Sequence, residues 1–342
     1  MFINLTFYLN KVATYTAVTG GGNWNNTATW GGAGYPQAGD TAILPATMTG
    51  TITVNVTSTC ATLTVSRAGA LMAMNANLTI TTGMSFGVGC GLNLSGTYNL
   101  IDAGTFTIAK TPSFTSTSTA TFVITGTMSL PIVTFNVNVQ FNTAGTVTLS
   151  GNYTFNKVLT KTAVTFAGSG TFTMTNGSTI YSVGSAYAPL VYFTGTVALG
   201  DDFVGNSLFG SGTHTITGAY NMSVSSWGFQ QTSTTTATGT YPSGQTITVS
   251  SNLYLQSPQA NSLSIVASSA GNSFNVIYGG TMANIKVHRI AFTDIDASGG
   301  GRIYNYFGTG TRVNNIVQVR NSDIGCVGVA LKTINKKRTF YV

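Results

Sequence analysis

Residues 49–80 read TGTITVNVTSTCATLTVSRAGALMAMNANLTI, and this stretch decides the fold class. In Thr51–Val54 and again in Thr62–Val65, threonine alternates with an apolar residue, as side chains do on the two faces of a β-strand. Glycine, asparagine and serine separate such units, and these residues favour turns. The stretch therefore predicts short, half-buried strands joined by turns.

The same theme recurs to about residue 175. The further units are Leu78–Ile80, Leu92–Leu94, Phe106–Ile108, Phe122–Ile124, Val147–Leu149 and Phe172–Met174. Successive units lie roughly a dozen residues apart, a spacing typical of a sandwich, a barrel or a solenoid. A sandwich needs tight hairpins, whose usual signal is an Asn-Gly or Asp-Gly dipeptide. The sequence has one such dipeptide, Asn176-Gly177. Repetition without hairpin signals predicts an all-β, elongated β-solenoid of the right-handed parallel β-helix type, with β-sandwich or jelly-roll modules as the alternative.

The composition favours the same class. Charged residues make up 6% of the chain, against roughly 25% in an ordinary globular domain. Glutamate is absent from the sequence, whereas hydrophobic residues reach 43%. Strong helix formers are thus scarce and β-branched residues abundant. The surface must be covered by hydroxyl and amide groups in place of charges.

Changes in composition predict three regions. Residues 1–48 form an N-terminal strand and a Trp-rich cap, 49–249 a repetitive Thr/Gly-rich β region, and 250–342 a basic C-terminal β module that caps or continues the solenoid. Nine of the fourteen Lys and Arg residues lie after residue 285 and contribute most of the net charge of +7. Their density is ordinary and does not favour nucleic-acid binding. No apolar stretch has the length of a membrane span.

The N-terminal residues alternate like a strand. Four apolar side chains fall on one side of it: Ile3, Leu5, Phe7 and Leu9. Such a strand could dock onto the sheet edge of a second copy and so build a homo-oligomer. The segment lacks the basic start and apolar run of a signal peptide, which fits assembly in a cytoplasm and release by lysis.

Two segments carry a resemblance to known proteins. Gly22-Asn23-Trp24 is followed by Thr29-Trp30, Pro36 and Gly39-Asp40, and this order resembles the entry motif of repetitive β-helical surface proteins of bacteria and bacteriophages. The segment from Phe292 to Gly300 is similar to one in predicted β-helix proteins of phages. The resemblance implies the fold and a virion or extracellular surface setting. It brings no catalytic residues, because those proteins share a scaffold and not a site.

The entry segment holds the first candidate site. Trp24 and Trp30 lie close together in a turn-rich stretch, and Asp40 follows Gly39 directly before an apolar strand. One interpretation is a structural cap over the open end of the core, with the Asp40 carboxylate bonded to a local backbone N–H. The other is an aromatic platform for a glycan. The cap is the preferred interpretation.

Asp294 and Asp296 form the best carboxylate pair. Two residues apart on a strand, they are predicted to project from the same face. A Ca²⁺ site or an acid/base pair would need such an arrangement. The preferred interpretation is that both carboxylates bond the backbone of the Gly-rich loop that follows.

Other chemistry-bearing residues give no pattern. Cys60, Cys90 and Cys326 form no CxxC pair, so buried free thiols are expected, without a disulfide framework or a bound metal. His214 and His288 have no neighbouring nucleophile motif. The sequence therefore predicts a protein without catalytic residues, metal or cofactor.

The leading hypothesis is a structural virion protein of a bacteriophage: a fibre, spike or decoration component. Its partners would be other copies of itself, other virion proteins and host surface glycans, which a hydroxyl-rich surface contacts weakly and multivalently. A secreted bacterial β-helical adhesin is one alternative, because it uses the same scaffold. A polysaccharide-degrading β-helix enzyme is the other, with Asp294 and Asp296 as its carboxylates.

Overall fold

The structure is a computed structural model. It describes residues 12–108, 113–130, 132–162, 164–182, 187–230, 236–257, 263–281, 284–301, 303–306 and 309–319. Parallel strands stack as a β-solenoid of about 11 turns. The contacts divide the chain into two compact units, Met1–Phe172 and Thr173–Val342. The described residues contain one short 3₁₀ helix, η1 (Thr27–Trp30).

Twenty strands begin in the first unit. They are β1 (Thr14–Thr16), β2 (Gly21–Asn23), β3 (Thr41–Leu44), β4 (Thr51–Val54), β5 (Ser58–Val65), β6 (Ala70–Met74), β7 (Leu78–Phe86), β8 (Gly91–Gly96), β9 (Asn99–Asp102), β10 (Thr105–Ile108), β11 (Ser113–Ser116), β12 (Thr121–Ile124), β13 (Met128–Leu130), β14 (Thr134–Asn136), β15 (Asn138–Asn142), β16 (Thr146–Leu149), β17 (Asn152–Phe155), β18 (Val158–Thr162), β19 (Thr165–Gly168) and β20 (Thr171–Met174).

The strands that begin in the second unit are longer on average. They are β21 (Ser178–Tyr181), β22 (Tyr187–Leu199), β23 (Phe203–Thr217), β24 (Met222–Gln230), β25 (Ala237–Tyr241), β26 (Thr246–Gln256), β27 (Leu263–Ala267), β28 (Phe274–Tyr278), β29 (Ile285–His288), β30 (Ile290–Asp296), β31 (Ile303–Tyr306), β32 (Thr309–Asn314) and β33 (Ile316–Val319).

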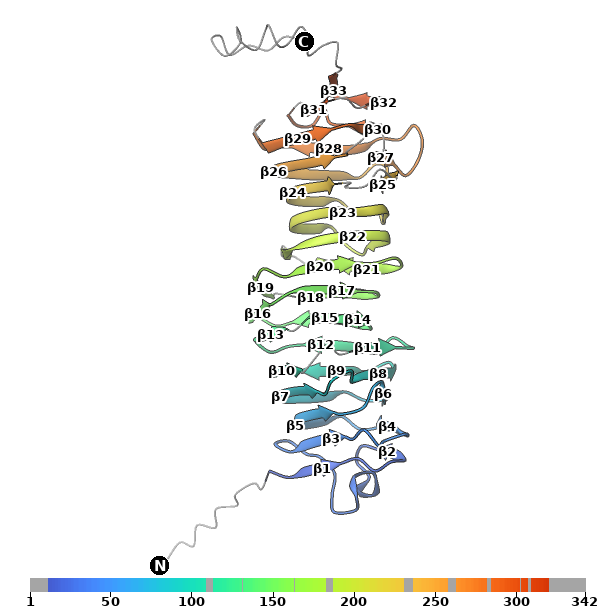
Figure 1. Cartoon of the computed structure of the whole chain (residues 1–342), viewed down its shortest axis with the longest axis vertical. Helices are drawn as coiled ribbons and strands as arrows, with labels where there is room; N and C mark the ends of the chain where they lie inside the picture. Colours follow the sequence, from blue (N-terminus) through green and yellow to red (C-terminus); the bar gives the residue numbers. More distant parts are fainter. Residues whose placement is uncertain are drawn as a thin grey trace, which may run out of the picture. The chain divides into compact units, whose positions relative to one another are not determined.

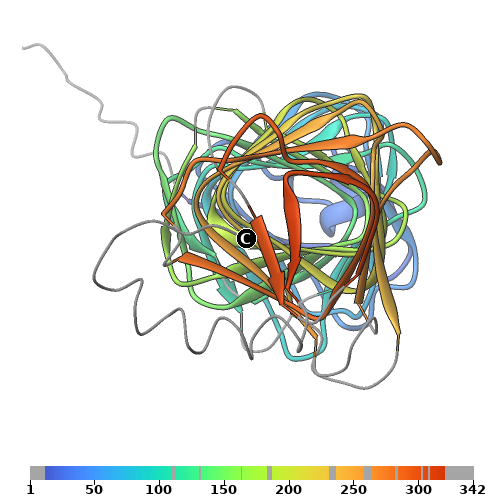
Figure 2. The same ribbon diagram turned by 90° about the horizontal axis from the view of Figure 1, so that it is seen from above.

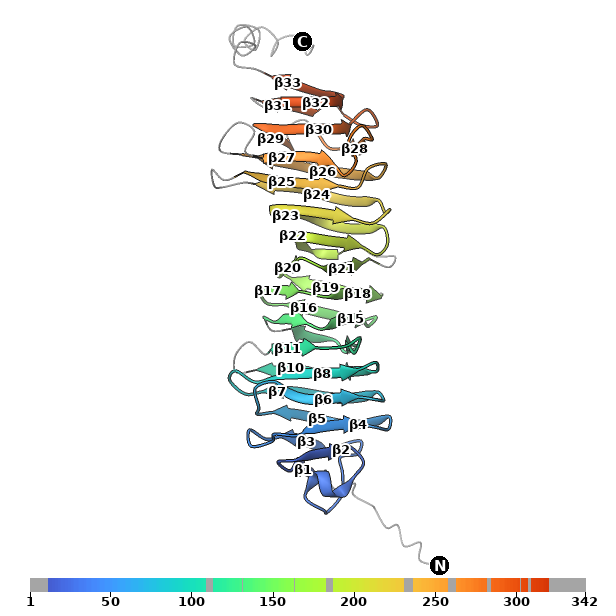
Figure 3. The same ribbon diagram turned by 90° about the vertical axis from the view of Figure 1, so that its right-hand side faces the viewer.

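Most strands of the first unit belong to three parallel ladders. One ladder runs β1–β3–β5–β7–β10, the second β2–β4–β6–β8–β11–β14–β17, and the third β5–β7–β9–β12–β15–β18. β13, β16 and β19 form a separate parallel sheet. Within each unit, Figures 1 and 3 show the labelled strands lying one above the next. The pairing is that of a solenoid and not of the alternative sandwich.

Single strands turn corners between ladders. In β5, residues 58–60 pair in the third ladder and residues 62–65 in the first, with a register shift between Cys60 and Thr62. In the second unit, β22 shows register shifts on either side of residues 190–193. Because one strand supplies several faces, a coil is built without hairpin turns.

The core is a stack of apolar columns that follow the register. In one such column Leu78, Leu100, Phe122, Val139 and Leu159 are successive register partners, and all of them are buried. Figure 2 shows the chain winding around this interior, which the buried side chains fill.

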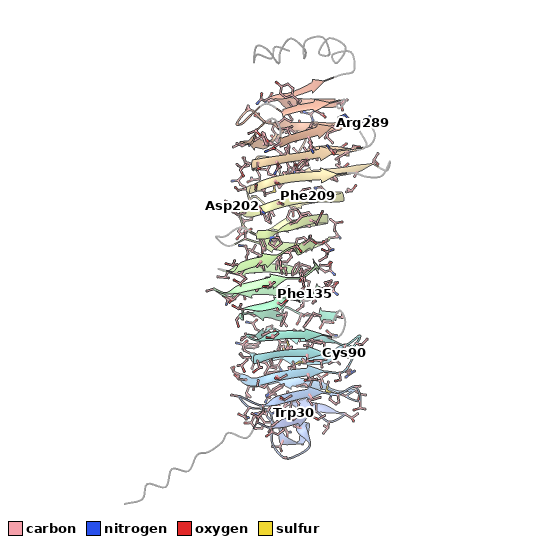
Figure 4. All side chains as sticks on the ribbon, turned by 60° about the vertical axis from the view of Figure 1, so that its left-hand side comes forward. Trp30, Cys90, Phe135, Asp202, Phe209 and Arg289 are labelled. Atoms are coloured by element: carbon pink, nitrogen blue, oxygen red, sulfur yellow. The ribbon has the colours of Figure 1, made fainter. Side chains whose placement is uncertain are left out.

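Aromatic rings also stack through the first unit. Phe135 lies between Phe114 and Phe155, with ring centroids 5.6 and 5.3 Å away, and Figure 4 labels its position. Such contacts add to the free energy gained by burying apolar area. The apolar half of each Thr-apolar repeat is therefore what holds neighbouring coils together.

The outer face of the first ladder carries a column of threonines. Thr14 pairs with Thr41, Thr41 with Thr62, Thr62 with Gly83, and Gly83 with Thr105. Gly83 interrupts the column and leaves a shallow hollow of about 240 Å³ beside Thr62 and Thr105. The polar half of the repeat thus forms an ordered hydroxyl surface.

The sequence predicted more regularity at 51–174 than elsewhere, but parallel pairing continues through residue 319. The predicted strand at Ile3, Leu5, Phe7 and Leu9 lies outside the described residues, as do Cys326 and the basic residues from Arg320 onward. The region boundaries predicted near residues 48 and 249 stay predictions. Among the described residues, no helix has the length and apolarity needed to cross a membrane.

Candidate functional site

The tryptophans of the entry segment are buried against each other. Trp24 has 0% of its surface exposed and Trp30 has 4%, and their ring centroids lie 5.0 Å apart at 75°. Trp30 Nε1–H donates to the carbonyl oxygen of Trp24 at 2.7 Å, and Trp24 Nε1–H donates to that of Pro36 at 3.3 Å. Figures 1 and 3 place the loop between β2 and β3 at one end of the first unit, and Figure 4 labels Trp30 there. Because neither ring face is open, the geometry favours the cap over a glycan platform.

Asp40 ties this loop to the first strand. Its Oδ1 accepts a hydrogen bond from the backbone N–H of Ala13 at 2.8 Å, and its Oδ2 accepts one from Gln37 at 2.9 Å. The residue is 7% exposed. Its carboxylate joins the start of the first coil to the end of the loop. The bond to Gln37 is the local backbone bond that the sequence predicted.

Asp294 and Asp296 do not share one environment. Asp294 has a φ of 58°, in the left-handed region, and burial along β30 loses its alternation there: Asp294 and Ile295 are both buried, whereas Asp296 is half-buried. The strand rule behind the same-face prediction assumes extended backbone, so it does not hold across this residue. The two carboxylates are placed separately by the bend.

Each carboxylate has its own partners. Asp294 accepts hydrogen bonds from Arg312 through both oxygens, and its Oδ2 also accepts one from the backbone N–H of Gly271 at 3.1 Å. The Arg312 hydrogen bonds lower the pKa of Asp294 below its usual value. Asp296 Oδ1 accepts from the backbone N–H of Ser298 at 2.9 Å, and bonding to Ser298 lowers its pKa as well. Both are ionised carboxylates. Asp296 bonds the following loop, as the preferred interpretation required, but that interpretation is wrong for Asp294, which bonds Gly271 and Arg312 instead.

A buried polar cluster in the second unit was not found by sequence reasoning. Trp227 Nε1–H donates to Tyr241 Oη at 3.1 Å, and His214 Nε2 lies 3.1 Å from the same oxygen. Since indole N–H is only a donor, Tyr241 Oη accepts from it and donates its own proton to His214 Nε2. His214 Nδ1–H then donates to the carbonyl oxygen of Gly212, 3.2 Å away.

This cluster leaves the imidazole neutral. Burial lowers the pKa of His214 to about 4 and raises that of Tyr241 beyond its usual range. A histidine with this pKa is a poor general base at neutral pH. The three residues lie far apart in sequence, and only the coil register brings them together. No local motif could have revealed them.

Asp102 and Cys60 are further ionisable residues buried in the first unit. Asp102 is fully buried; its Oδ1 accepts from the Gly104 N–H at 3.1 Å, and its Oδ2 has no hydrogen-bond partner in the described part of the chain. Burial raises the pKa of Asp102 to about 6. Burial, together with the charge of Asp40, raises the pKa of Cys60 to about 12. Cys60 and Cys90 are buried free thiols, as the sequence predicted.

The residues described above are held in internal hydrogen bonds and ring contacts. Among the described residues, no group of three or more His, Cys, Asp or Glu side chains could hold a metal ion. The two tryptophans close one end of the first unit, and Asp294 holds the bend in β30. His214, Trp227 and Tyr241 form a buried hydrogen-bond network. Each of these holds the coils in place and leaves the outer surface to meet other molecules.

Comparisons of this chain with protein-family models, with curated proteins and with solved structures give no match.

Proposed function

We propose that this chain is a structural component of a bacteriophage virion: a fibre, spike or decoration protein that acts through its shape and its outer surface. The observation that carries the proposal is the ordered, nearly uncharged hydroxyl surface of the coils. In the first unit, Thr14, Thr41, Thr62 and Thr105 belong to one outer column. Such a surface is built by repetition and has many equivalent contact points.

The hydroxyl-rich outer face of the coils is suited to many simultaneous weak contacts with one partner. A single hydroxyl or amide contributes little to affinity, because it exchanges a hydrogen bond with water for one with the ligand. Repeated along a coil stack and across several copies, the same contacts give avidity. Host surface glycans and further copies of the chain are the partners that this proposal names.

The roles found for the ionisable residues support a scaffold rather than an enzyme. A retaining or inverting glycosidase needs one carboxyl group with a raised pKa and a second one facing it across the bond to be cleaved. Both Asp294 and Asp296 have lowered pKa values, and Asp294 is paired with Arg312. These features favour the structural proposal over a polysaccharide-degrading enzyme.

The proposal is tested by locating the chain in its source culture. Antibodies raised against the purified protein should label intact virus particles in immunogold electron microscopy, at tails, spikes or capsid surfaces. Particles from which the gene has been deleted serve as the control and should lose the label. Gold confined to the surface of uninfected cells would contradict the virion proposal and support the adhesin.

A further inference from the structure

An aromatic column runs along one outer face of the second unit. Tyr192 pairs with Phe209, Phe209 with Gly228, Gly228 with Tyr254, and Tyr254 with Lys286. These five residues, the aromatic strip, occupy one position on five neighbouring strands of one ladder, β22, β23, β24, β26 and β29. Since parallel strands lie about 4.8 Å apart, the strip is about 19 Å long.

The side chains of the strip point outward. The residues on either side of Phe209 in sequence are buried, as are those beside Tyr254, whereas both aromatic residues are half-buried and Lys286 is exposed. Figure 4 labels Phe209 on its coil. Tyr192 and Phe209 have ring centroids 5.9 Å apart at 48°. The strip thus places three aromatic side chains in one line on the outer face of the second unit.

Gly228 lets the Phe209 ring lie against the backbone. A Cβ atom at Gly228 would lie 2.2 Å from Phe209 Cε1, so the ring occupies the space where a side chain would stand. One face of the ring covers the glycine, which protects the sheet backbone. Because Phe209 is half-buried, part of its ring remains accessible to solvent.

A polar column runs beside the strip, and a cation ends it. Two positions before the strip residues lie Ser207, Ser226 and Asn252, with Asn252 Nδ2 donating to Ser226 Oγ at 3.0 Å. At the far end, Lys286 Nζ lies 5.4 Å from the centre of the Tyr254 ring. Ring faces, hydroxyl and amide groups, and one ammonium are therefore aligned along a single line of coils.

We propose that the aromatic strip binds a glycan chain that carries an acidic sugar. The apolar face of a sugar ring packs on an aromatic face, and its hydroxyl groups can bond the flanking serine and asparagine side chains. Lys286 supplies a charge-assisted contact for the carboxylate of a uronic or sialic acid residue.

A glycan fits the strip better than a second copy of the chain does. A stable protein interface buries about 800 Å² on each partner, and a strip one side chain wide is far narrower than that. A linear saccharide matches its width and its direction. This inference rests on the proposed function, because it names the surface and the ligand class of the glycan contact.

The test is affinity electrophoresis of the full chain in gels that contain soluble polysaccharides. Polygalacturonate, hyaluronate, alginate and polysialic acid are the acidic probes; dextran and hydroxyethylcellulose are the neutral ones. The wild-type chain should be retarded by at least one acidic probe. Phe209→Ala and Tyr254→Ala should each weaken binding by about tenfold or more, as loss of a central aromatic contact does.

Lys286 is tested in the same gels. Lys286→Ala should weaken retardation by the acidic probe, Lys286→Arg should preserve it, and added salt should reduce it. The matched control is Tyr220→Ala, which removes an exposed tyrosine outside the strip and should bind like wild type. Thermal unfolding of each variant, followed by circular dichroism, shows whether it is folded. Phe209→Ala and Tyr254→Ala are independent, so a folding defect in one leaves the other as the test.

The remaining outcomes separate the inference from the proposed function. If wild type binds an acidic probe and both aromatic variants bind it equally well, the strip is not the site, although the proposed glycan contact stands. Binding to neutral probes alone, or to none of the probes, overturns the acidic-glycan site but does not bear on labelling of virus particles. Loss of self-association in Phe209→Ala, measured by sedimentation, would assign the strip to a contact between copies and overturn the inference.

Discussion

Asp102 is the residue whose environment is most at odds with its chemistry. It is fully buried, and within the described residues its carboxyl group accepts one hydrogen bond, from the backbone N–H of Gly104. An ionised carboxylate in such a site loses its hydration without gaining an ion pair. The carboxyl group therefore holds its proton to a pKa of about 6.

This residue should make the stability of the first unit depend on pH. The pKa of Asp102 is about 6 in the folded chain and near the ordinary 3.8 in the unfolded chain, so stability is full below pH 3.8 and is lost as pH rises through 6. At pH 8 this difference in pKa lowers the free energy of unfolding by about 3 kcal/mol compared with its value below pH 3.8. The Asp102→Asn substitution removes this pH-dependent loss of stability. The melting temperature of Asp102→Asn should therefore rise relative to wild type between pH 4 and pH 8.

Other titrating groups change both proteins alike, so the difference between the two melting temperatures isolates Asp102. An offset that is the same at pH 4 and at pH 8 would show that the carboxyl group has an ordinary pKa in the folded chain.

No sequence pattern indicates this environment. Asp102 follows the apolar run of β9, and on alternation alone its side chain was as compatible with a loop as with the core. The same limit applies to His214 and Tyr241, whose partnership depends on residues being stacked in neighbouring coils. Trp24 and Trp30 were easier to interpret, because two tryptophans within one short turn-rich loop must contact each other or solvent.

At the scale of the strand, alternation predicted most of what the structure shows. Thr51–Val54 is β4, and the other Thr-apolar units quoted from the sequence all lie within strands. The prediction failed at bends. At Asp294 a single residue in the left-handed region moves the following side chains to the other face. A non-glycine residue at such a φ is uncommon, so the alternating sequence gave no warning of it.

Glycine residues inside strands also restrict the strands, because neighbouring backbone approaches them closely. Gly83 has a φ of +151°, and a Cβ there would lie 2.0 Å from the carbonyl oxygen of Thr105 on the next coil. Gly83→Ala should force the two strands apart and lower the free energy of unfolding by about 1–3 kcal/mol, as overpacking does. Urea unfolding followed by circular dichroism measures this change.

Gly20→Ala is the control for this substitution. A Cβ at Gly20 has no atom within 4 Å, and its φ lies outside the left-handed region. That variant should unfold at the wild-type urea concentration. Equal destabilisation by the two substitutions would mean that the close approach of β7 and β10 does not restrict Gly83.

At the scale of the whole chain, composition and repetition predicted the stacked parallel architecture, but they could not assign strands to faces. Thr51 and Thr62 look like consecutive members of one repeat, yet Thr51 pairs in the second ladder and Thr62 in the first. Coil length also varies, since Thr14 and Thr41 are neighbours in one ladder just as Thr41 and Thr62 are. The register depends on how apolar side chains fill the interior, and that cannot be read from spacing. The aromatic strip stayed hidden in the sequence for the same reason.

Disulfide trapping tests whether the outer residues of successive coils are aligned in parallel register. Thr41→Cys with Thr62→Cys joins register partners on β3 and β5, whose Cα separation in adjacent strands suits a disulfide. Thr41→Cys with Thr53→Cys joins residues that are closer in sequence but lie on different ladders. Under mild oxidation, peptide mapping by mass spectrometry should find the 41–62 cross-link and not the 41–53 cross-link. Efficient formation of the 41–53 link without the 41–62 link would contradict the stacked register.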